Sequence, residues 1–298
     1  MRYRPFARTG MAISALSLSL DGDDMTRSAA DWRDLIHAGF EEGINAFEIV
    51  RPTPILLSGV AEGASAVERR LLFVALRIDA AGEGAQLGVQ VAGVIAETGL
   101  GTLDLLSVDA LPGEPRGMPA AMRELKERGL VRSLGVAGAC DALTPHVEAG
   151  AFDALITSFN IHSGWRERHM VRTALERQMA VIGVEPCPVD AGPVADAAKV
   201  KPKPHWFAKR NPLAGVGTYA FLSKTPGWTA EQMCLGYALT EPSLATVQVV
   251  VEDAEHLTSL AEVTERDMPA AASAQIEMAR FSAERSSGVE RRSERRTA

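Results

Sequence analysis

Hydrophobic residues in this chain gather in short uninterrupted runs that alternate with stretches of helical periodicity. The segment from Leu103 to Gly138 shows the pattern clearly. Leu103–Val108 is an apolar run, Pro119–Arg128 has apolar residues about one turn apart and stops before Gly129, and Ser133–Ala137 is a second apolar run. Two strand-like runs joined by a helix predict parallel pairing with a right-handed crossover.

The same alternation continues along most of the chain. The predicted strands are Ile13–Leu20, Ile44–Val50, Leu71–Ile78, Leu103–Val108, Ser133–Ala137, Ala154–Ser158, Ala180–Val184 and Thr246–Val251. The predicted helices are Asp31–Glu42, Ile55–Ala66, Gln86–Thr98, Pro119–Arg128, Leu143–Ala149, Arg166–Gln178, Thr229–Thr240 and Ala254–Glu265. Eight alternations within roughly 250 residues are the count of an α/β fold of the (β/α)8 TIM barrel type. A doubly wound sheet is the alternative.

Three segments depart from this alternation. Arg2–Ile13 contains two turn-forming residues and predicts a short hairpin or arm, Pro186–Trp228 is a long proline-rich loop, and Pro269–Ser282 predicts an additional helix. Residues 283–298 are almost purely Arg, Glu and Ser and cannot bury apolar area, which predicts a disordered tail. We therefore divide the chain into a barrel of residues 1–282 and a tail of residues 283–298.

Composition narrows the classes of function. The net charge is −7 and the pI about 5.5, which disfavours nucleic-acid binding because phosphates require a basic surface. There is no apolar run of the ~18 residues that a membrane span needs and no N-terminal signal pattern, so we expect a cytoplasmic protein without membrane insertion. The cysteines, Cys140, Cys187 and Cys234, are far apart, and no motif has the spacing of a metal site.

Several segments resemble the aldo-keto reductase family, in order along the chain. MRYRPFARTGMAISALSL resembles its N-terminal hairpin and first strand, and LIHAGFEEGINAFE its first helix and second strand. LGTLDLLSVDA, ELKERGLVRSLGVAG and FDALITSFNIH follow its fourth to sixth strands. IGVEPCPVDAG resembles the loop after its seventh strand, and MCLGYALTEPSLATVQVVVEDAEHL its last helix, strand and phosphate-contacting turn. The resemblance implies the same barrel.

The resemblance also marks where this chain departs from the family. Members reduce carbonyl groups with NADPH, using an Asp, a Tyr, a Lys and a His. The positions that match these four residues are Glu48, Thr53, Arg77 and Asp109, so none of the four is retained. The Thr hydroxyl is too weak an acid to replace the Tyr as proton donor, and Asp109 accepts hydrogen bonds where the His would donate one.

The cofactor positions implied by the resemblance are altered as well. The family binds NADP(H), and its phosphates contact the turn after the eighth strand. Here that turn includes Val250, Glu252 and Asp253, so two carboxylates face the phosphate position. Asn160 after the sixth strand is retained, and Cys187 lies in the loop after the seventh. These five residues are the candidate cofactor contacts.

We expect Glu48, Arg77 and Asp109 to point into one end of the barrel. One interpretation is a structural salt-bridge cluster, with one guanidinium between two carboxylates. The other is a new acid–base pair or a cation site. The acidic residues of the segment 21–24 would line the same rim, unless they are solvated loop charges.

Three hypotheses of function follow. The first is a catalytically degenerate aldo-keto-reductase-like protein that acts by binding, as a scaffold, regulatory subunit or ligand sensor. The alternative is an atypical NAD(P)H-dependent oxidoreductase acting on carbonyl substrates. The third is non-redox catalysis with Glu48 or Asp109 as the base. A protein partner would bind the loops around the end of the barrel, or the basic segment Lys199–Arg210.

Overall fold

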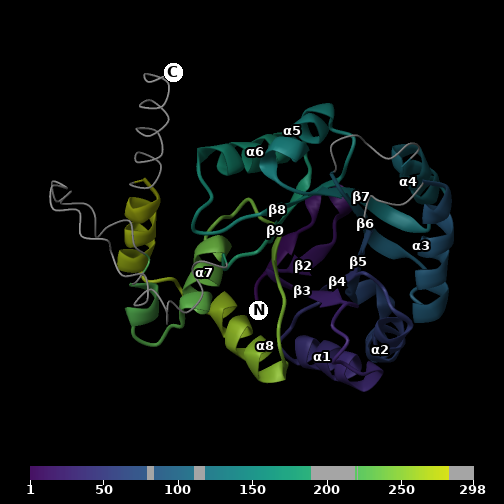
Figure 1. Cartoon of the computed structure of the whole chain (residues 1–298), viewed down its shortest axis with the longest axis horizontal. Helices are drawn as coiled ribbons and strands as arrows, with labels where there is room; N and C mark the ends of the chain where they lie inside the picture. The colour runs from purple at the N-terminus through teal and green to yellow at the C-terminus, as the bar shows by residue number, and fades with distance from the viewer. Residues whose placement is uncertain (79–83, 111–117, 189–218, 220, 282–298) are drawn as a thin grey trace, which may run out of the picture.

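The computed structural model describes residues 1–78, 84–110, 118–188, 219 and 221–281, and within them eight parallel strands close into a barrel surrounded by helices (Figure 1). The barrel strands are β3 (Leu16–Asp21), β4 (Ala46–Val50), β5 (Phe73–Ile78), β6 (Leu103–Asp109), β7 (Val131–Ala137), β8 (Ala154–Ser158), β9 (Ala180–Val184) and β10 (Thr246–Val249). Strand β10 pairs with both β9 and β3, which closes the sheet. The predicted (β/α)8 barrel is confirmed, and the doubly wound alternative is wrong because the sheet has no open edge.

The outer layer consists of helices that follow the strands. They are α1 (Ala29–Glu41), α2 (Pro54–Ala64), α3 (Gly84–Thr98), α4 (Met118–Glu127), α5 (Cys140–Ala149), α6 (Trp165–Glu176), α7 (Ala230–Leu239) and α8 (Ala254–Ala261). Helix α1 begins two residues before its predicted start at Asp31. Ser28 is the N-cap, its hydroxyl accepts a hydrogen bond from the Asp31 amide, and the Asp31 carboxylate accepts one from the Ser28 amide. This reciprocal capping box explains the earlier start.

The predicted N-terminal hairpin is confirmed, but it takes part of the predicted first strand. β1 (Tyr3–Pro5) pairs with β2 (Ala12–Ser14), so the apolar run Ile13–Leu20 is divided between β2 and β3. Phe6 and Ile13 are fully buried in a cluster with inward-facing barrel residues such as Ala75. The hairpin therefore closes the end of the barrel where the strands begin.

The described residues form two main apolar layers. Alternate residues of the strands face outward and pack against the helices, as Leu16, Leu18 and Leu20 do from β3. The inward residues near the hairpin are mostly small and apolar, whereas those near the carboxyl ends of the strands include Glu48 and Arg77. We call the end formed by these carboxyl ends the mouth.

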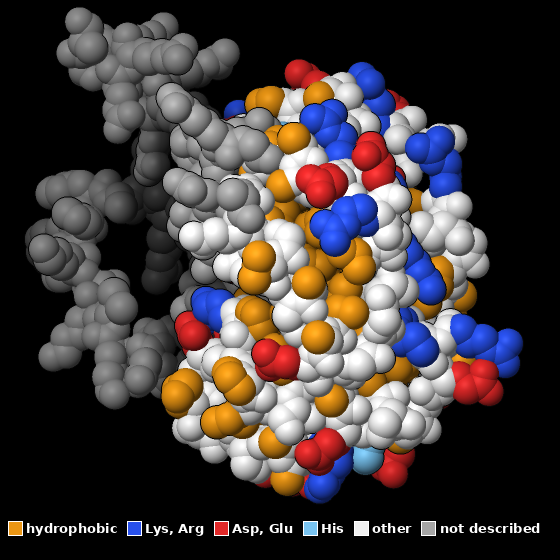
Figure 2. Space-filling view, turned by 90° about the vertical axis from the view of Figure 1, so that its right-hand side faces the viewer, with side chains coloured by type: hydrophobic (Ala, Val, Ile, Leu, Met, Phe, Trp, Pro, Cys, Tyr) orange, Lys and Arg blue, Asp and Glu red, His pale blue; other side chains and the backbone are white. Residues whose placement is uncertain are grey.

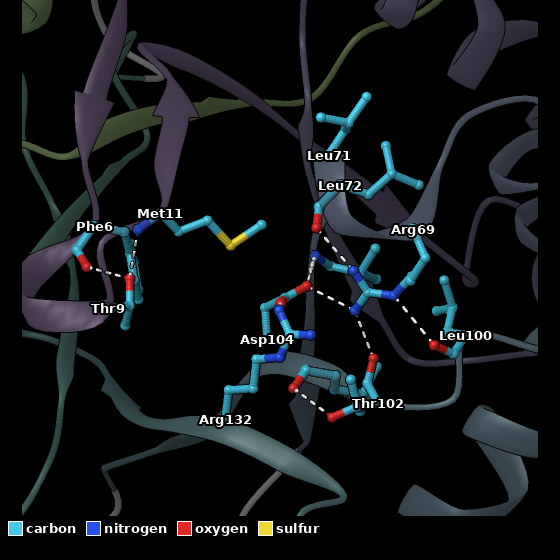
Figure 3. Close-up of polar contacts among 12 residues, drawn as sticks. Phe6, Thr9, Met11, Arg69, Leu71, Leu72, Leu100, Thr102, Asp104 and Arg132 are labelled. Carbon is cyan, nitrogen blue, oxygen red and sulfur yellow. Dashed lines mark hydrogen bonds and ion pairs between the residues drawn. The ribbon is translucent and has the colours of Figure 1, made fainter.

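A buried carboxylate joins three strands at the opposite end of the barrel (Figure 3). Asp104 of β6 is 2% exposed and binds the guanidinium of Arg69 at 2.7 Å and that of Arg132, on β7, at 2.8 Å. It also accepts a hydrogen bond from the Val74 amide of β5 at 2.8 Å. A charge this deeply buried needs such partners, because desolvation otherwise disfavours its ionised form.

The predicted C-terminal helix is present at residues 270–281 and lies beside α7 (Figure 1). Its buried Ile276 packs in an apolar cluster that includes Tyr237 of α7. The carboxylate of Glu277 accepts hydrogen bonds from the Tyr237 hydroxyl at 2.6 Å, from Arg168 of α6 at 3.0 Å and from Arg280. This Glu277 cluster attaches the helix to the barrel.

We expect the attachment of this helix to weaken in acid. Burial raises the pKa of Glu277, but the hydrogen bonds from Arg280 and Tyr237 and the charge of Arg168 outweigh it, so the pKa lies below its ordinary value. The carboxylate therefore stabilises the folded state above its ordinary pKa of ~4.3, and this stabilisation is lost as the pH falls through the lower folded-state pKa. Melting temperatures between pH 7 and pH 3 should fall less for Glu277→Gln than for the wild type.

Removal of an exposed carboxylate provides the control for that measurement. Glu176→Gln removes an exposed carboxylate of α6 and should leave the pH dependence of the melting temperature unchanged. A wild-type profile that matches Glu277→Gln throughout this pH range would contradict the assignment.

The long loop predicted over Pro186–Trp228 lies partly outside the described ranges, and two further predictions lie wholly outside them. These are the basic segment Lys199–Arg210 and the tail of residues 283–298. None of the helices in the described ranges combines the length and the apolar character needed to cross a membrane.

Candidate functional site

The mouth carries the polar side chains of four strands. Glu48 lies on β4, Arg77 on β5, Asp109 at the end of β6 and Gln248 on β10. Alternation along each strand brings these side chains to the inner surface. The carboxyl ends of the strands are where TIM barrels hold their functional sites. The predicted positions thus converge at one end of the barrel.

Glu48 is the centre of a hydrogen-bonded network. Its carboxylate is buried, with 3% of the side chain exposed, and binds the Arg77 guanidinium with a shortest distance of 2.9 Å. The Gln248 amide donates to Oε2 of Glu48 at 2.8 Å, and the Ser107 hydroxyl donates to Oε1 at 3.4 Å. The Gln248 carbonyl oxygen in turn accepts from Arg77 at 3.4 Å. Glu48, Arg77 and Gln248 therefore form a closed ring of contacts.

This arrangement differs in part from the predicted salt-bridge cluster. One guanidinium between Glu48 and Asp109 was expected, and the structure instead gives Arg77 a carboxylate and an amide as partners. Gln248 replaces a second charge because its amide both donates and accepts. Asp109 is half-buried at the end of β6, in register with Ala137 of β7.

The network limits what Glu48 can do chemically. A general base must reach the proton that it removes, with an oxygen lone pair available to accept it. Both oxygens of Glu48 are held by donors, and the donors are side chains of three different strands. Such a carboxylate is positioned to fix the strands in place, as in other buried charge networks.

Thr53, which matches the family's Tyr, has a structural role. Its hydroxyl oxygen accepts a hydrogen bond from the Leu56 amide at 3.3 Å and caps α2, with Pro54 as the first helical residue. Ser, Thr, Asp and Asn are the usual N-caps, and Pro is favoured at the first helical position. The predicted helix start at Ile55 is one residue late for this reason.

The retained Asn160 also supports the backbone. Its side-chain nitrogen donates to the Ser158 hydroxyl at 3.2 Å and to the Glu185 carbonyl at 3.1 Å, and its side-chain oxygen accepts from the His162 amide at 2.9 Å. These contacts join the loops that follow β8 and β9. Cys187 is half-buried beside the apolar cluster under the C-terminal helix.

The turn after β10 is occupied by internal contacts. The carboxylate of Asp253 accepts a hydrogen bond from the His256 amide at 2.8 Å and caps α8. An anion of the chain itself therefore lies at the N-terminus of this helix. Arg27 donates to the carbonyl oxygens of Val251 at 2.8 Å and Glu252 at 2.6 Å, and pairs with Asp24 at 2.8 Å.

These residues do not fit the phosphates of NADP(H). A helix N-terminus binds phosphate when its amides are available and the surrounding charge is positive. Here a carboxylate takes the α8 amide, Glu252 adds a second exposed carboxylate, and Val250 is 67% exposed without polar atoms in its side chain. Arg27 has its charge balanced by Asp24. A group with several negative charges would meet repulsion at this turn.

The described residues bring no three His, Cys, Asp or Glu side chains into a cluster that could hold a metal ion.

The contacts that the sequence did not predict are those of Gln248, Ser107 and Arg27. Gln248 and Ser107 had one available signal, since each is a polar residue at an inward position of an apolar strand. Arg27 had none, because its partners include backbone oxygens far along the chain.

Comparisons with known proteins agree on the fold. No protein-family model matches the chain, and no curated protein sequence matches it. The structure is similar to that of aldo-keto reductase AKR11C1 from Bacillus halodurans in its holo form, with a TM-score of 0.72 at 14% identity. The apo form of the same reductase gives a TM-score of 0.68 at 15% identity. Both comparisons cover 93% of this chain and 95% of the reductase, so the aldo-keto reductase fold expected from the sequence resemblance is confirmed.

Proposed function

We propose that this protein is a binding protein built on the aldo-keto reductase fold, which acts as a scaffold, regulatory subunit or ligand sensor and does not reduce carbonyl groups. The supporting observation is the closed hydrogen-bonded ring of Glu48, Arg77 and Gln248 at the positions where catalysis would occur. Thr53 adds support, because its hydroxyl oxygen caps α2.

The chemistry of carbonyl reduction explains why this ring argues for binding. Hydride transfer places negative charge on the substrate oxygen, and catalysis requires donors directed at that charge and an acid to protonate it. Arg77 directs its charge to Glu48. The Asp109 carboxylate near the same end would repel a developing alkoxide, at a cost of roughly 4 kcal/mol for two charges ~4 Å apart at an effective dielectric constant of 20.

The cofactor position supports the same proposal. The Asp253 cap and the charge of Glu252 disfavour dinucleotide phosphates at the turn after β10. Partner contacts would then use the loops at the mouth, the part of this fold that varies most readily without altering the barrel. The cytoplasmic location expected from the sequence remains part of this proposal.

NADPH-dependent reduction of a panel of aldehydes and ketones tests the proposal. We expect no turnover above the rate without enzyme, and no change in melting temperature at millimolar NADPH. A nucleotide at 100 times its dissociation constant would add ~2.7 kcal/mol to the free energy of unfolding, which a melting curve detects. An aldo-keto reductase with all four catalytic residues serves as the positive control. Clear turnover on any of these substrates would overturn the proposal in favour of an atypical oxidoreductase.

A further inference from the structure

A groove on the side of the barrel lies between α2 and α3, and it shares Arg77 with the ring around Glu48. Its volume is about 660 Å3, within the roughly 300–1,000 Å3 typical of small-molecule sites. The loop after β4 forms one wall and α3 forms the other. Figure 2 looks onto the side of the barrel that carries α3 and α4, and hydrophobic side chains gather in the middle of this face.

Apolar side chains form about half of the groove lining. Pro52 and Pro54 line it from the β4 loop, Ile78 from the end of β5, and Val89 from α3. Val89 is 76% exposed, although its side chain carries no polar atom. The hydroxyl of Thr53 and the amide of Gln90 add hydrogen-bonding groups at the walls. A few polar groups within an apolar lining are the usual composition of a small-molecule site.

One residue of α3 contributes no side chain to the groove lining. Gly93 lines it, and a Cβ atom built at this position meets no other atom within 4 Å. Glycine in a helix interior lowers helix stability relative to Ala, and this position has room for a larger side chain.

The wall opposite Gly93 is held rigidly. Arg51 has a φ of 45°, in the left-handed region that non-glycine residues seldom adopt. A Cβ atom at Gly22 would lie 2.0 Å from the Arg51 carbonyl oxygen, so only glycine allows this approach of the two loops. Pro52 and Pro54 each have a fixed φ and restrict the residue before them. A preformed wall lowers the entropy lost when a ligand binds.

Charge at the groove indicates the class of ligand. Four charged residues line it, two acidic and two basic: Asp23, Glu97, Arg51 and Arg77. Arg51 pairs with Asp23 at 2.8 Å, and Arg77 pairs with Glu48 at 2.9 Å. Arg51 also pairs with Asp21, so carboxylates of the same chain match both guanidinium charges and the groove does not favour an anion.

We propose that the groove between α2 and α3 binds an uncharged, predominantly apolar small molecule of the size of one or two fused rings. The apolar body lies against Pro52, Ile78 and Val89, and a single polar group bonds to Thr53 or Gln90. This site goes beyond the function proposed for the mouth, because Arg77 is the one ring residue that lines the groove and the proposed ligand contacts are made by other residues.

The uncharged fluorescent probe N-phenyl-1-naphthylamine tests the site with two matched variants of the full chain. Gly93→Leu adds a bulky side chain to the groove lining. Gly88→Leu changes the other glycine of α3 whose added Cβ meets no atom within 4 Å, and this glycine lies outside the groove. Both variants gain helix propensity in the same helix. We expect saturable probe fluorescence with the wild type and with Gly88→Leu, and a dissociation constant at least tenfold larger for Gly93→Leu.

Three outcomes would overturn the proposal. They are a wild-type titration that does not saturate, an unchanged dissociation constant for Gly93→Leu, and an equal loss in both variants. Circular dichroism of Gly93→Leu establishes that the variant is folded, and Val89→Asp provides a second test by placing a charge at the rim without filling the groove. The aldehyde-reduction assay addresses the mouth separately, so failure of one proposal is distinguishable from failure of the other.

Discussion

Glu48→Ala should lower the free energy of unfolding by about 3 kcal/mol, the scale seen when one partner of a buried ion pair is removed. The substitution leaves the Arg77 guanidinium, 20% exposed, without its carboxylate and leaves the Gln248 amide without its acceptor. Urea unfolding followed by circular dichroism measures the change. An unchanged m value, the slope of the free energy of unfolding against urea concentration, indicates that the unfolded state is unchanged.

Two controls isolate the network in this experiment. Glu62→Ala removes an exposed carboxylate whose nearest pairing with Arg33 is 3.5 Å, and should change stability by no more than ~0.5 kcal/mol. Replacing Glu48 and Arg77 together by Leu should recover most of the loss, because removing both charges leaves neither one unpaired. A Glu48→Ala variant as stable as the wild type would show that the ring does not hold the strands together.

Asp104→Ala should have an effect of similar or larger size, about 4 kcal/mol, because it deprives two guanidiniums and a buried amide of their acceptor. Asp104 is 2% exposed and joins β5, β6 and β7 through Val74, Arg69 and Arg132, as Figure 3 shows. Asp104→Asn should lose less, since one oxygen of the amide can still accept from Val74.

The matched control for Asp104 is Asp34→Ala, which removes a carboxylate that is 66% exposed on α1. Its expected effect is below ~0.5 kcal/mol. Equal stability of Asp104→Ala and the wild type would contradict the role assigned to this carboxylate. Since Asp104 and Glu48 lie near opposite ends of the barrel, the effects of the two substitutions should add.

The fold was accessible from the sequence because its main signal is local. A buried parallel strand is a short apolar run, and Ala154–Ser158 and Ala180–Val184 have the same bounds in the structure as in the prediction. The predicted start of a helix was wrong where two neighbouring residues could both serve as its N-cap. Ser28 and Asp31 are both capable N-caps, and only the reciprocal bonds between them show that Ser28 is the N-cap of α1.

The candidate site was less accessible because its contacts are distant in the sequence. Glu48 and Arg77 were predicted to meet, since adjacent strands of a barrel place them together. Gln248 lies 200 residues from Glu48, and the pair is adjacent only after β10 closes the barrel. Asp104 interrupts an apolar run, and its partners, 28 and 35 residues away, are not indicated by any spacing.

Closure of the barrel has a consequence for the order in which the chain can fold during its synthesis. β3 is among the first segments to leave the ribosome, yet its partner β10 begins at Thr246. The hairpin depends on the same late region, because Arg4 donates to carbonyl oxygens of Leu239, Glu241 and Leu244. Until these residues emerge, β3 presents an unpaired edge to other chains. A ribosome pausing shortly before residue 246 would therefore expose this protein to its greatest risk of misassembly.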